Sequence, residues 1–215
     1  IIVDDDDDDD DGGSVESAEA GAGSKRKSAE KDEGGVVEVS PPLKEKKPKC
    51  LFFSSFFYAI LRNSKGGYSY NNVKRWCRKV NLPDYDFVFF PINVANSHWT
   101  LAIVNPKKNR IRYLDSLGGK NQQCLKLLET FLQDEGKARG FTEMTKKWDL
   151  DSVGPSTAGI PAQGDSCSCG LFVLSYADCI SSGKKLTDLR GCFAQHDMAN
   201  VRAYVLETLL GCRMK

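Results

Sequence analysis

The feature that most limits how this chain can fold is an abrupt change of composition near residue 50. Before that point the sequence is polar: Asp4–Asp11 is an unbroken acidic run, and the stretch after it is rich in Gly, Ser, Ala and Glu. Such a segment buries too little apolar surface to offset the entropy that a chain loses on folding. We therefore expect residues 1–49 to form a disordered tail with acidic and basic stretches, and residues 50–215 to form one folded domain.

Charge is distributed unevenly between these two parts. Residues 1–50 carry 15 acidic and 8 basic side chains, whereas the remaining 165 residues carry 14 acidic and 22 basic ones. A basic folded part suits an acidic partner surface, on a protein or a nucleic acid, although charges scattered over a solvated surface give the same count. The acidic run itself is either a solubilising tail or a segment that folds back onto the basic domain.

Two short basic clusters lie in the tail, Lys25–Lys27 and Lys44–Lys49. Clusters of this kind can act as nuclear-import signals, and they also occur by chance. We predict a nuclear location, either alone or shared with the cytoplasm. The first residue is Ile rather than Met, so we expect a fragment or a processed chain. No secretory signal is visible in the sequence.

The chain holds eight cysteines and two histidines. No two cysteines have the Cys-x-x-Cys spacing of a zinc site, and two histidines leave few candidates for a mixed one, so we predict no metal site. No apolar run reaches the roughly 20 residues that cross a bilayer, so we predict no membrane span. The simplest interpretation of these thiols is that they are reduced, as in the cytosol or the nucleus.

Apolar spacing in the folded part predicts both helices and strands. Helical patterns occur at residues 51–61, 70–80, 125–132, 171–180 and 198–210, the fourth as a buried helix and the last as an amphipathic helix that closes the fold. Strand-like runs occur at 87–92, 99–104, 110–114 and 148–153, and the loop 105–109 joins the second and third of them as a hairpin. Because helices and strands are partly segregated along the chain, the predicted fold class is α+β.

His98 and Asp115 stand at the two outer ends of the predicted hairpin. His98 precedes an apolar strand, which can hold the imidazole rigid while the ring faces a cleft. A hairpin symmetric about residues 106–108 brings Asp115 near the start of the first strand. There its carboxylate can accept the Nδ1–H of His98 and leave Nε2 for a nucleophile. A purely structural contact between the two side chains at a strand edge is the alternative.

The segment Gln163–Gly170 leads directly into the apolar helix. A thiol at a helix N-terminus lies at the positive end of the helix dipole, which favours the reactive thiolate. Gln163 offers a side-chain N–H donor for an oxyanion, beside the backbone N–H of Cys169. The alternative is a glycine turn before a core helix, with the cysteines as small buried apolar residues.

Cys167 and Cys169 compete for the role of nucleophile. Cys169 directly precedes Gly170 and the helix, so its backbone N–H is the better placed of the two to stabilise an oxyanion. Cys167 lies in the approach loop. We therefore favour Cys169.

Several short motifs follow one another in one order from about Lys49 to the C-terminus. They are Phe52–Tyr58, Val73–Trp76, Phe89–Asn93, His98–Leu101, Tyr113–Leu117, Ile160–Gln163, Cys169–Phe172 and Tyr176–Asp178. In this combination the chain resembles the Ulp/SENP family of SUMO proteases. The resemblance implies a papain-like α+β fold, with a central mixed sheet flanked by helices.

The resemblance also implies a function, namely hydrolysis after the C-terminal Gly-Gly of SUMO-type modifiers, in precursor processing, in deconjugation or in both. By this match His98 is the base, Asp115 its orienting carboxylate, Cys169 the nucleophile and Gln163 the oxyanion donor. Trp99 matches the tryptophan that lines the narrow channel for the Gly-Gly tail. The implied partners are SUMO-type modifiers and their conjugates, with no cofactor, no nucleic acid and no membrane.

This sequence departs from the family pattern at two places. Ser168 stands where the family usually has Asp, immediately before the nucleophile. The Trp-Leu-Asn-Asp type segment and the helix that usually precede the Phe-rich stretch do not precede Leu51. We therefore interpret residues 50–215 as a ubiquitin-like protease catalytic domain that is N-terminally incomplete. Two functions follow: an active thiol isopeptidase, or a SUMO-binding protein that turns over weakly or not at all.

The tail offers a further candidate contact. Val36, Val37 and Val39 form a short β-prone run with acidic residues upstream, and Ile1–Val3 before the aspartates is a second example. Both resemble SUMO-interacting motifs, which add a strand to a sheet edge of the modifier while acidic flanks meet a basic rim. Short valine runs also occur by chance in polar tails.

Overall fold

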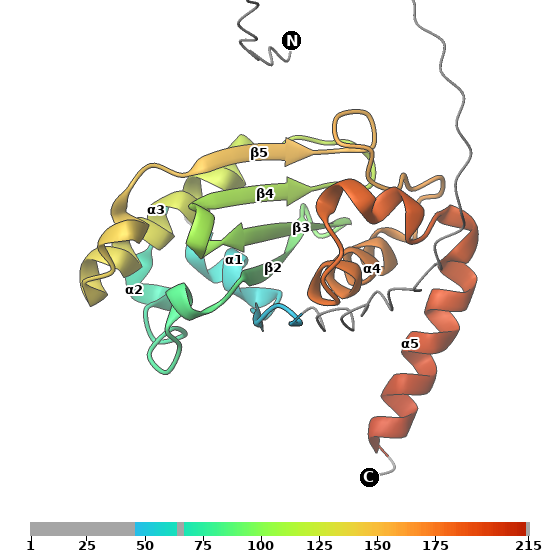
Figure 1. Ribbon diagram of the computed structural model, residues 1–215, viewed down its shortest axis with the longest axis horizontal. Coiled ribbons are helices and arrows are strands. Elements are labelled where there is room, and N and C mark those ends of the chain that lie inside the picture. Colours follow the sequence, from blue (N-terminus) through green and yellow to red (C-terminus); the bar gives the residue numbers. More distant parts are fainter. Residues whose placement is uncertain (1–45, 64–66, 214–215) are drawn as a thin grey trace, which may run out of the picture. The chain divides into compact units, whose positions relative to one another are not determined.

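The computed structural model describes residues 46–63 and 67–213 (Figure 1). Within them, one mixed sheet has the strand order β1-β2-β3-β4-β5. The central strands β2, β3 and β4 are antiparallel neighbours, whereas β1 runs parallel to β2 and β5 runs parallel to β4. The strands are β1 (Cys50–Phe52), β2 (Phe87–Val94), β3 (His98–Asn105), β4 (Arg110–Leu114) and β5 (Asp149–Val153).

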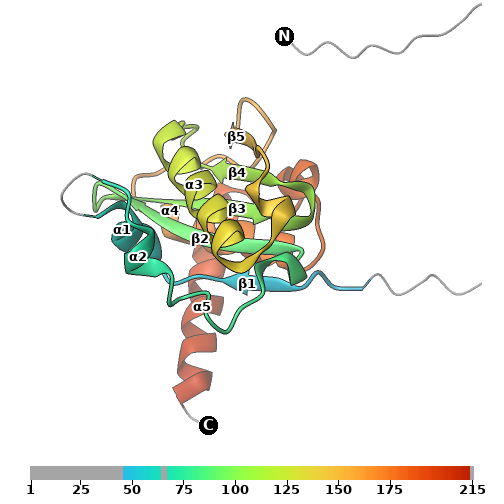
Figure 2. The ribbon, with the colours of Figure 1, turned by 90° about the vertical axis from the view of Figure 1, so that its left-hand side faces the viewer.

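Helices cover both faces of this sheet, with α1 and α3 on one side and α4 on the other (Figure 2). This arrangement confirms the predicted α+β class. The helices are α1 (Phe56–Arg62), α2 (Tyr70–Val73), α3 (Gln122–Arg139), α4 (Cys169–Ser181) and α5 (Met198–Arg213). The predictions about the acidic run and the run Val36–Val39 concern residues outside the described ranges.

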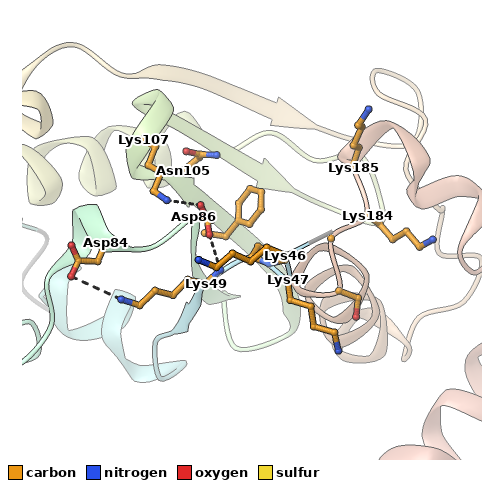
Figure 3. A pocket seen from close by; sticks show the side chains of 13 residues that line it. Lys46, Lys47, Lys49, Asp84, Asp86, Asn105, Lys107, Lys184 and Lys185 are labelled. Atoms are coloured by element: carbon orange, nitrogen blue, oxygen red, sulfur yellow. Dashed lines mark hydrogen bonds and ion pairs between the residues drawn. The ribbon is translucent and has the colours of Figure 1, made fainter. Parts of the chain in front are cut away.

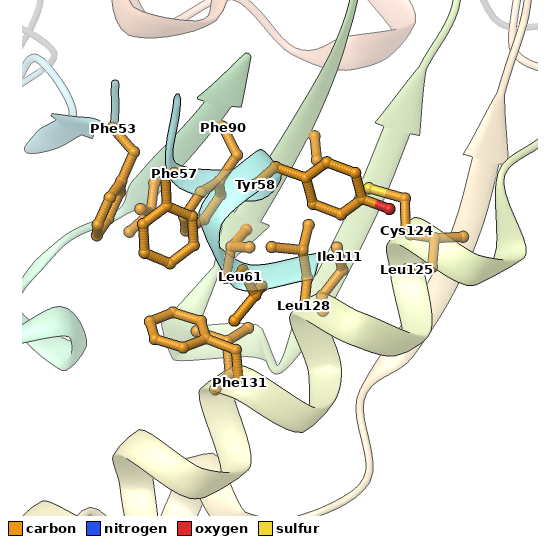
Figure 4. Close-up of a cluster of buried hydrophobic side chains, with 14 of the residues drawn as sticks. Phe53, Phe57, Tyr58, Leu61, Phe90, Ile111, Cys124, Leu125, Leu128 and Phe131 are labelled. Carbon is orange, nitrogen blue, oxygen red and sulfur yellow. The ribbon is translucent and has the colours of Figure 1, made fainter. Parts of the chain in front are cut away.

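Each sheet face has its own hydrophobic core, because successive strand residues point to opposite sides. In β2, Phe90 belongs to the core beneath α1 and α3, whereas Phe89 belongs to the core beneath α4. Figure 4 shows the first core, in which the Phe57 ring centroid lies 5.1 Å from that of Phe90 and 4.9 Å from that of Phe131. The second core joins Phe89 to Phe172 near the start of α4, which fixes that end of the helix against the sheet.

The hairpin of β3 and β4 sets the positions of His98 and Asp115. Its register pairs Leu101 with Leu114, and the other pairs follow symmetrically about a tip at residues 106–108, as predicted. His98 is the first residue of β3, and Asp115 is the first residue past β4. Both therefore lie at the open end of the hairpin.

The predicted helix at 51–61 is wrong in its first part, where the structure has strand β1. A short apolar run cannot be assigned to helix or strand from its spacing alone. Here β1 pairs with β2, and Phe52 stacks on Phe89 with ring centroids 4.7 Å apart. The neighbouring β2 therefore decides the conformation of this segment, and α1 begins only at Phe56.

The predicted helix at 70–80 is also shorter than expected. Only Tyr70–Val73 is α-helical. Beyond it, the backbone N–H groups of Trp76 and Val80 bond to carbonyls three residues back, at 2.8 and 2.9 Å, which gives tighter turns than an α-helix has. The spacing did indicate which residues are buried, since Val73 and Cys77 are both fully buried.

The two C-terminal helices differ in how far they are buried. Helix α4 is mostly buried as predicted, although Leu174 is 48% exposed. Helix α5 forms, but of its side chains Met198 is buried and Val201 is half-buried, whereas Tyr204 and Leu209 are largely exposed. The predicted helix is confirmed, and Val201, Tyr204 and Leu209 share a face that lines a pocket with Leu174 of α4, but that face is only partly covered.

Two features are absent from the residues that the structure describes. None of their helices combines the length and the apolar character that crossing a bilayer requires. No cluster of at least three His, Cys, Asp and Glu side chains among them is arranged to hold a metal ion.

Candidate active site

The ring of His98 meets the carboxylate of Asp115 at the open end of the hairpin. His98 Nε2 lies 2.8 Å from Asp115 Oδ1, and the two side chains are 20% and 6% exposed. The predicted contact forms, but the predicted ring nitrogen is wrong, since Asp115 meets Nε2 rather than Nδ1. If the register is continued past β4, Asp115 lies opposite Thr100, which is two residues from His98. Nε2 is the ring nitrogen farther from the His98 backbone, so it can reach across these two residues to the carboxylate. Nδ1 is therefore the nitrogen left to exchange a proton with a thiol.

The Asp115 carboxylate is confined on several sides. Its Oδ1 also accepts the backbone N–H of Leu117 at 2.8 Å, and the backbone N–H of Asp115 bonds to the carbonyl of Val153 at 3.1 Å. Gly119 comes so close that a Cβ added there would stand 2.5 Å from Asp115 Oδ2. This side of the site requires glycine, and the crowding keeps the carboxylate on His98.

Cys169 is the first residue of α4 and is buried. The residue after it, Gly170, lies against the indole of Trp99: an added Cβ would stand 3.7 Å from Trp99 Cδ1. Trp99 in turn follows His98 in β3. Cys169 and His98 therefore each directly precede one of the two residues in this contact. The thiol of Cys169 also lies at the positive end of the helix dipole.

The start of α4 also offers a hydrogen-bond donor. The first backbone N–H groups of a helix have no partner within the helix. Here the N–H of Phe172 bonds to the carbonyl of Ser168 at 3.0 Å, whereas the N–H of Cys169 meets no acceptor among the described residues. This N–H is available to a developing oxyanion on a carbonyl attacked by the adjacent thiolate.

Three other cysteines are less suited to be the nucleophile. Burial raises the pKa of Cys77 and of Cys124 to about 12, so both remain protonated thiols near neutral pH. Cys167 is exposed and lies two residues before the helix begins. The helix start thus falls at Cys169, as the sequence interpretation required.

Gln163 is buried, and its side-chain amide is held at both ends. Oε1 accepts a hydrogen bond from the Ser116 hydroxyl at 2.9 Å. Nε2 donates to the backbone carbonyl of Asp165 at 2.7 Å and to the Asp165 carboxylate at 3.1 Å. The backbone N–H of Gln163 also bonds to the Ser116 carbonyl at 3.0 Å. Gln163, the predicted oxyanion donor, therefore lies beside Ser116, which directly follows Asp115 in the chain.

Two further residues of the site, Asp165 and Gln195, were not predicted from the sequence. Asp165 accepts hydrogen bonds from the backbone N–H groups of Cys167 and Ser168, from the Ser168 hydroxyl and from the Gln195 side chain. These bonds, led by the one from the Ser168 hydroxyl, hold the pKa of Asp165 well below its usual range. Asp often accepts hydrogen bonds from backbone N–H groups two or three residues further along a turn. Its position just before the predicted helix was therefore a signal from which this role of Asp165 could have been predicted. Nothing in the local sequence points to Gln195.

A separate cavity of about 860 Å³ lies at the opposite end of β3 and α4 (Figure 3). Its lining includes Asn105, the last residue of β3, and Gly183, just past α4, whereas His98 and Cys169 begin those two elements. Much of the remaining lining is basic and consists of Lys46, Lys47, Lys49, Lys107, Lys184 and Lys185. No candidate catalytic residue reaches this cavity, so we do not assign the chemistry to it.

A helix that begins with a cysteine packs against a strand that begins with a histidine, and the next strand ends beside an aspartate. On a mixed sheet covered by helices on both faces, this arrangement defines the class of papain-like cysteine protease folds. The papain-like fold implied by the sequence resemblance is thereby confirmed.

Comparison with known proteins identifies a family within this class of folds. A model of the Ulp1 protease family, C-terminal catalytic domain, matches residues 38–213. The chain is 34% identical over 167 residues to ubiquitin-like-specific protease 1A of Arabidopsis thaliana, and 36% identical over 159 residues to sentrin-specific protease 2 of Mus musculus. Among solved structures, the C-terminal Ulp1 protease domain in complex with Smt3, the yeast ortholog of SUMO, matches with a TM-score of 0.63 and 28% identity. That match covers 79% of this chain and 71% of the other.

The chain therefore belongs to the Ulp1 protease family of cysteine proteases, of which it carries the catalytic domain. The two alignments with curated relatives cover 75% and 74% of this chain, but only 31% and 25% of those relatives. The chain thus spans about a quarter to a third of their length.

Proposed function

We propose that this chain is a thiol protease that cleaves after the C-terminal Gly-Gly of a SUMO-type modifier, from precursors, conjugates or both. The observation that carries the proposal is the junction of β3 and α4. There Trp99 and Gly170 are in contact, and each directly follows a candidate catalytic residue: His98, which is paired with Asp115, and Cys169. Membership of a family whose relatives are named for ubiquitin-like and sentrin substrates supports the choice of substrate.

The proposed reaction has two halves. Nδ1 of His98 takes the proton of Cys169, and the thiolate attacks the carbonyl carbon of the terminal glycine. The Cys169 N–H and the Gln163 amide stabilise the oxyanion that forms. The C–N bond breaks, His98 gives its proton to the leaving amine, and a thioester remains. His98 then activates water, which releases the glycine carboxylate and restores the thiol.

Each further role rests on position. Asp115 accepts the Nε2–H of His98, and so keeps Nδ1 toward the thiol and stabilises the charged ring. Trp99 lies over the helix start beside the nucleophile, where an indole wall can exclude side chains larger than those of glycine. This wall is our explanation for a Gly-Gly requirement.

A C-terminal vinyl-sulfone derivative of SUMO tests this proposal directly. The electrophile should form a covalent adduct at Cys169, located by peptide mass spectrometry, and a panel of ubiquitin-like fusions should show preferential cleavage of the SUMO fusion. Binding of SUMO without an adduct or cleavage would instead support the alternative, a SUMO-binding protein. Neither binding nor cleavage would defeat both functions.

Gly119→Ala should lower turnover by on the order of 10- to 100-fold, because the new methyl group must displace the Asp115 carboxylate from His98. The measurement is the steady-state rate on the preferred fusion. Gly191→Ala is the control, since a Cβ there meets nothing within 4 Å. Equal rates for the two variants would show that the position of this carboxylate does not limit catalysis.

Two proposals concern the tail. The basic clusters support a nuclear location, which imaging of a fluorescent fusion of the full chain would test. Docking of Val36, Val37 and Val39 on the modifier would be tested by titrating labelled SUMO with a peptide of residues 30–42, with the three valines changed to alanine in the control.

A further inference from the structure

We propose that Asp165 is a positioning residue that, together with Ser116, holds the Gln163 amide in place as an oxyanion donor. This inference rests on the proposed function and adds to it residues that do not touch the reacting atoms.

The first support is the way the Gln163 amide is fixed. An unrestrained glutamine side chain has several rotatable bonds, and ordering it costs conformational entropy at every turnover. Here Ser116 donates to Oε1 at 2.9 Å, which fixes the oxygen end of the amide. At the other end Nε2 donates to the Asp165 carbonyl at 2.7 Å and to its carboxylate at 3.1 Å. Both acceptors belong to one residue, so one N–H can be shared between them in a three-centre bond, and the second N–H of the amide is left for the oxyanion. Donors fixed before the reaction stabilise a transition state better than mobile ones.

The second support is that the same carboxylate shapes the approach to the nucleophile. Asp165 Oδ1 accepts the N–H groups of Cys167 and Ser168 at 3.1 and 2.9 Å, and Oδ2 accepts the Ser168 hydroxyl at 2.6 Å. The chain then enters α4, where the N–H of Cys169 is the next donor along the backbone. One side chain therefore contacts both the Gln163 amide and the turn that presents the Cys169 N–H.

The third support is that a distant segment braces Asp165. Gln195 lies beyond α4, yet its Nε2 donates to Asp165 Oδ2 at 2.8 Å. Its Oε1 accepts the backbone N–H of Gly164 at 2.7 Å. The two bonds bracket the loop on both sides of Asp165, so this exposed carboxylate keeps one orientation. Hydrogen bonds to the ionised form also keep Asp165 charged, and so an acceptor, through the pH range of an enzyme assay.

This role makes a prediction that distinguishes acyl transfer from thiol reactivity. Peptide or ester cleavage passes through an oxyanion, whereas alkylation of a thiolate by iodoacetamide does not. Asp165→Ala should therefore lower kcat on a SUMO fusion by about 10- to 100-fold, with KM little changed, because loss of a whole oxyanion donor costs roughly 10²–10³. The rate of Cys169 alkylation, followed by peptide mass spectrometry, should stay within about threefold of wild type.

Three variants complete the test. Ser116→Ala should resemble Asp165→Ala, because it releases the other end of the same amide. Asp165→Asn keeps one oxygen and should fall between wild type and Asp165→Ala. Asp188→Ala removes another exposed carboxylate, which lies outside the site, and should leave kcat unchanged. Parallel losses of cleavage and alkylation, or an unchanged kcat in Asp165→Ala, would overturn the inference.

A readout independent of activity separates this inference from the proposed function. Of the two side-chain N–H protons of Gln163, identified by their absence in Gln163→Glu, the one bound to Asp165 should exchange slowly with water in the wild-type protein and faster in Asp165→Ala. If the wild-type chain cleaves no modifier, the proposed function fails, and these resonances still decide whether Asp165 orders the amide. Identical exchange in the two proteins would refute the positioning role.

Discussion

Replacing Cys169 with serine should abolish cleavage of a SUMO fusion, with a loss on the order of 10⁶ by analogy with removal of the nucleophile from a serine protease. The physical reason is that the thiolate, not the thiol, attacks the carbonyl, and a serine hydroxyl at this position ionises far less readily. The measurement is the initial rate of cleavage, and the same variant should not react with the vinyl-sulfone derivative.

Cys167→Ser is the matched control, because it makes the same atomic change two residues earlier. Cys167 is exposed and lies outside α4, where the helix dipole acts more weakly and the contact between Gly170 and Trp99 is absent. This variant should keep most of the activity. If instead Cys167→Ser is inactive and Cys169→Ser is active, the nucleophile is misassigned.

Asp115→Ala should have the second-largest effect, a loss of about 10⁴ in kcat, as found when the orienting carboxylate of a serine triad is changed. Without the carboxylate, the Nε2–H of His98 loses its acceptor, and the ring is no longer restricted to the tautomer with a free Nδ1. The charged ring that forms during the reaction also loses its counter-charge. The rate should be measured together with thermal unfolding.

The unfolding measurement keeps this second test specific. Removal of the buried carboxylate also leaves the N–H of Leu117 without its acceptor, which should cost about 1 kcal/mol of stability because Leu117 is largely exposed and water can reach this N–H. That loss shifts the melting temperature but leaves the domain folded at 25 °C. A folded Asp115→Ala protein with a normal rate would remove this residue from the site.

Much of the fold could be predicted because its signals are local. Short apolar runs gave the strands at 99–104 and 110–114, and the symmetry of the hairpin that joins them gave the proximity of His98 and Asp115. The apolar run after Gly170 gave the helix and its start at Cys169. Each of these signals lies within one element or one hairpin, where spacing alone carries the information.

What could not be predicted depends on partners far away in the sequence. Phe52 is in a strand because it stacks on Phe89 of the neighbouring strand, and no local pattern shows that neighbour. The ring nitrogen of His98 that meets Asp115 is set by the exact offset across the hairpin, which a symmetry argument does not resolve. Likewise, Gln195 reaches Asp165 through a side-chain contact without any periodic signal.

Because the register of the β3–β4 hairpin is symmetric, the length of its turn determines whether His98 and Asp115 meet at the candidate site. The turn of a hairpin sets the pairing of every residue along its two strands. If the turn kept its geometry, one residue gained or lost at 106–108 would slide one strand past the other and turn its side chains to the opposite face. The tip is about 25 Å from the open end, given a rise of roughly 3.3 Å per residue. Both faces of these strands are buried, which resists such a slip, so only an insertion that the turn does not absorb would separate His98 from Asp115. At the tip, therefore, catalysis constrains the number of residues more than their identity.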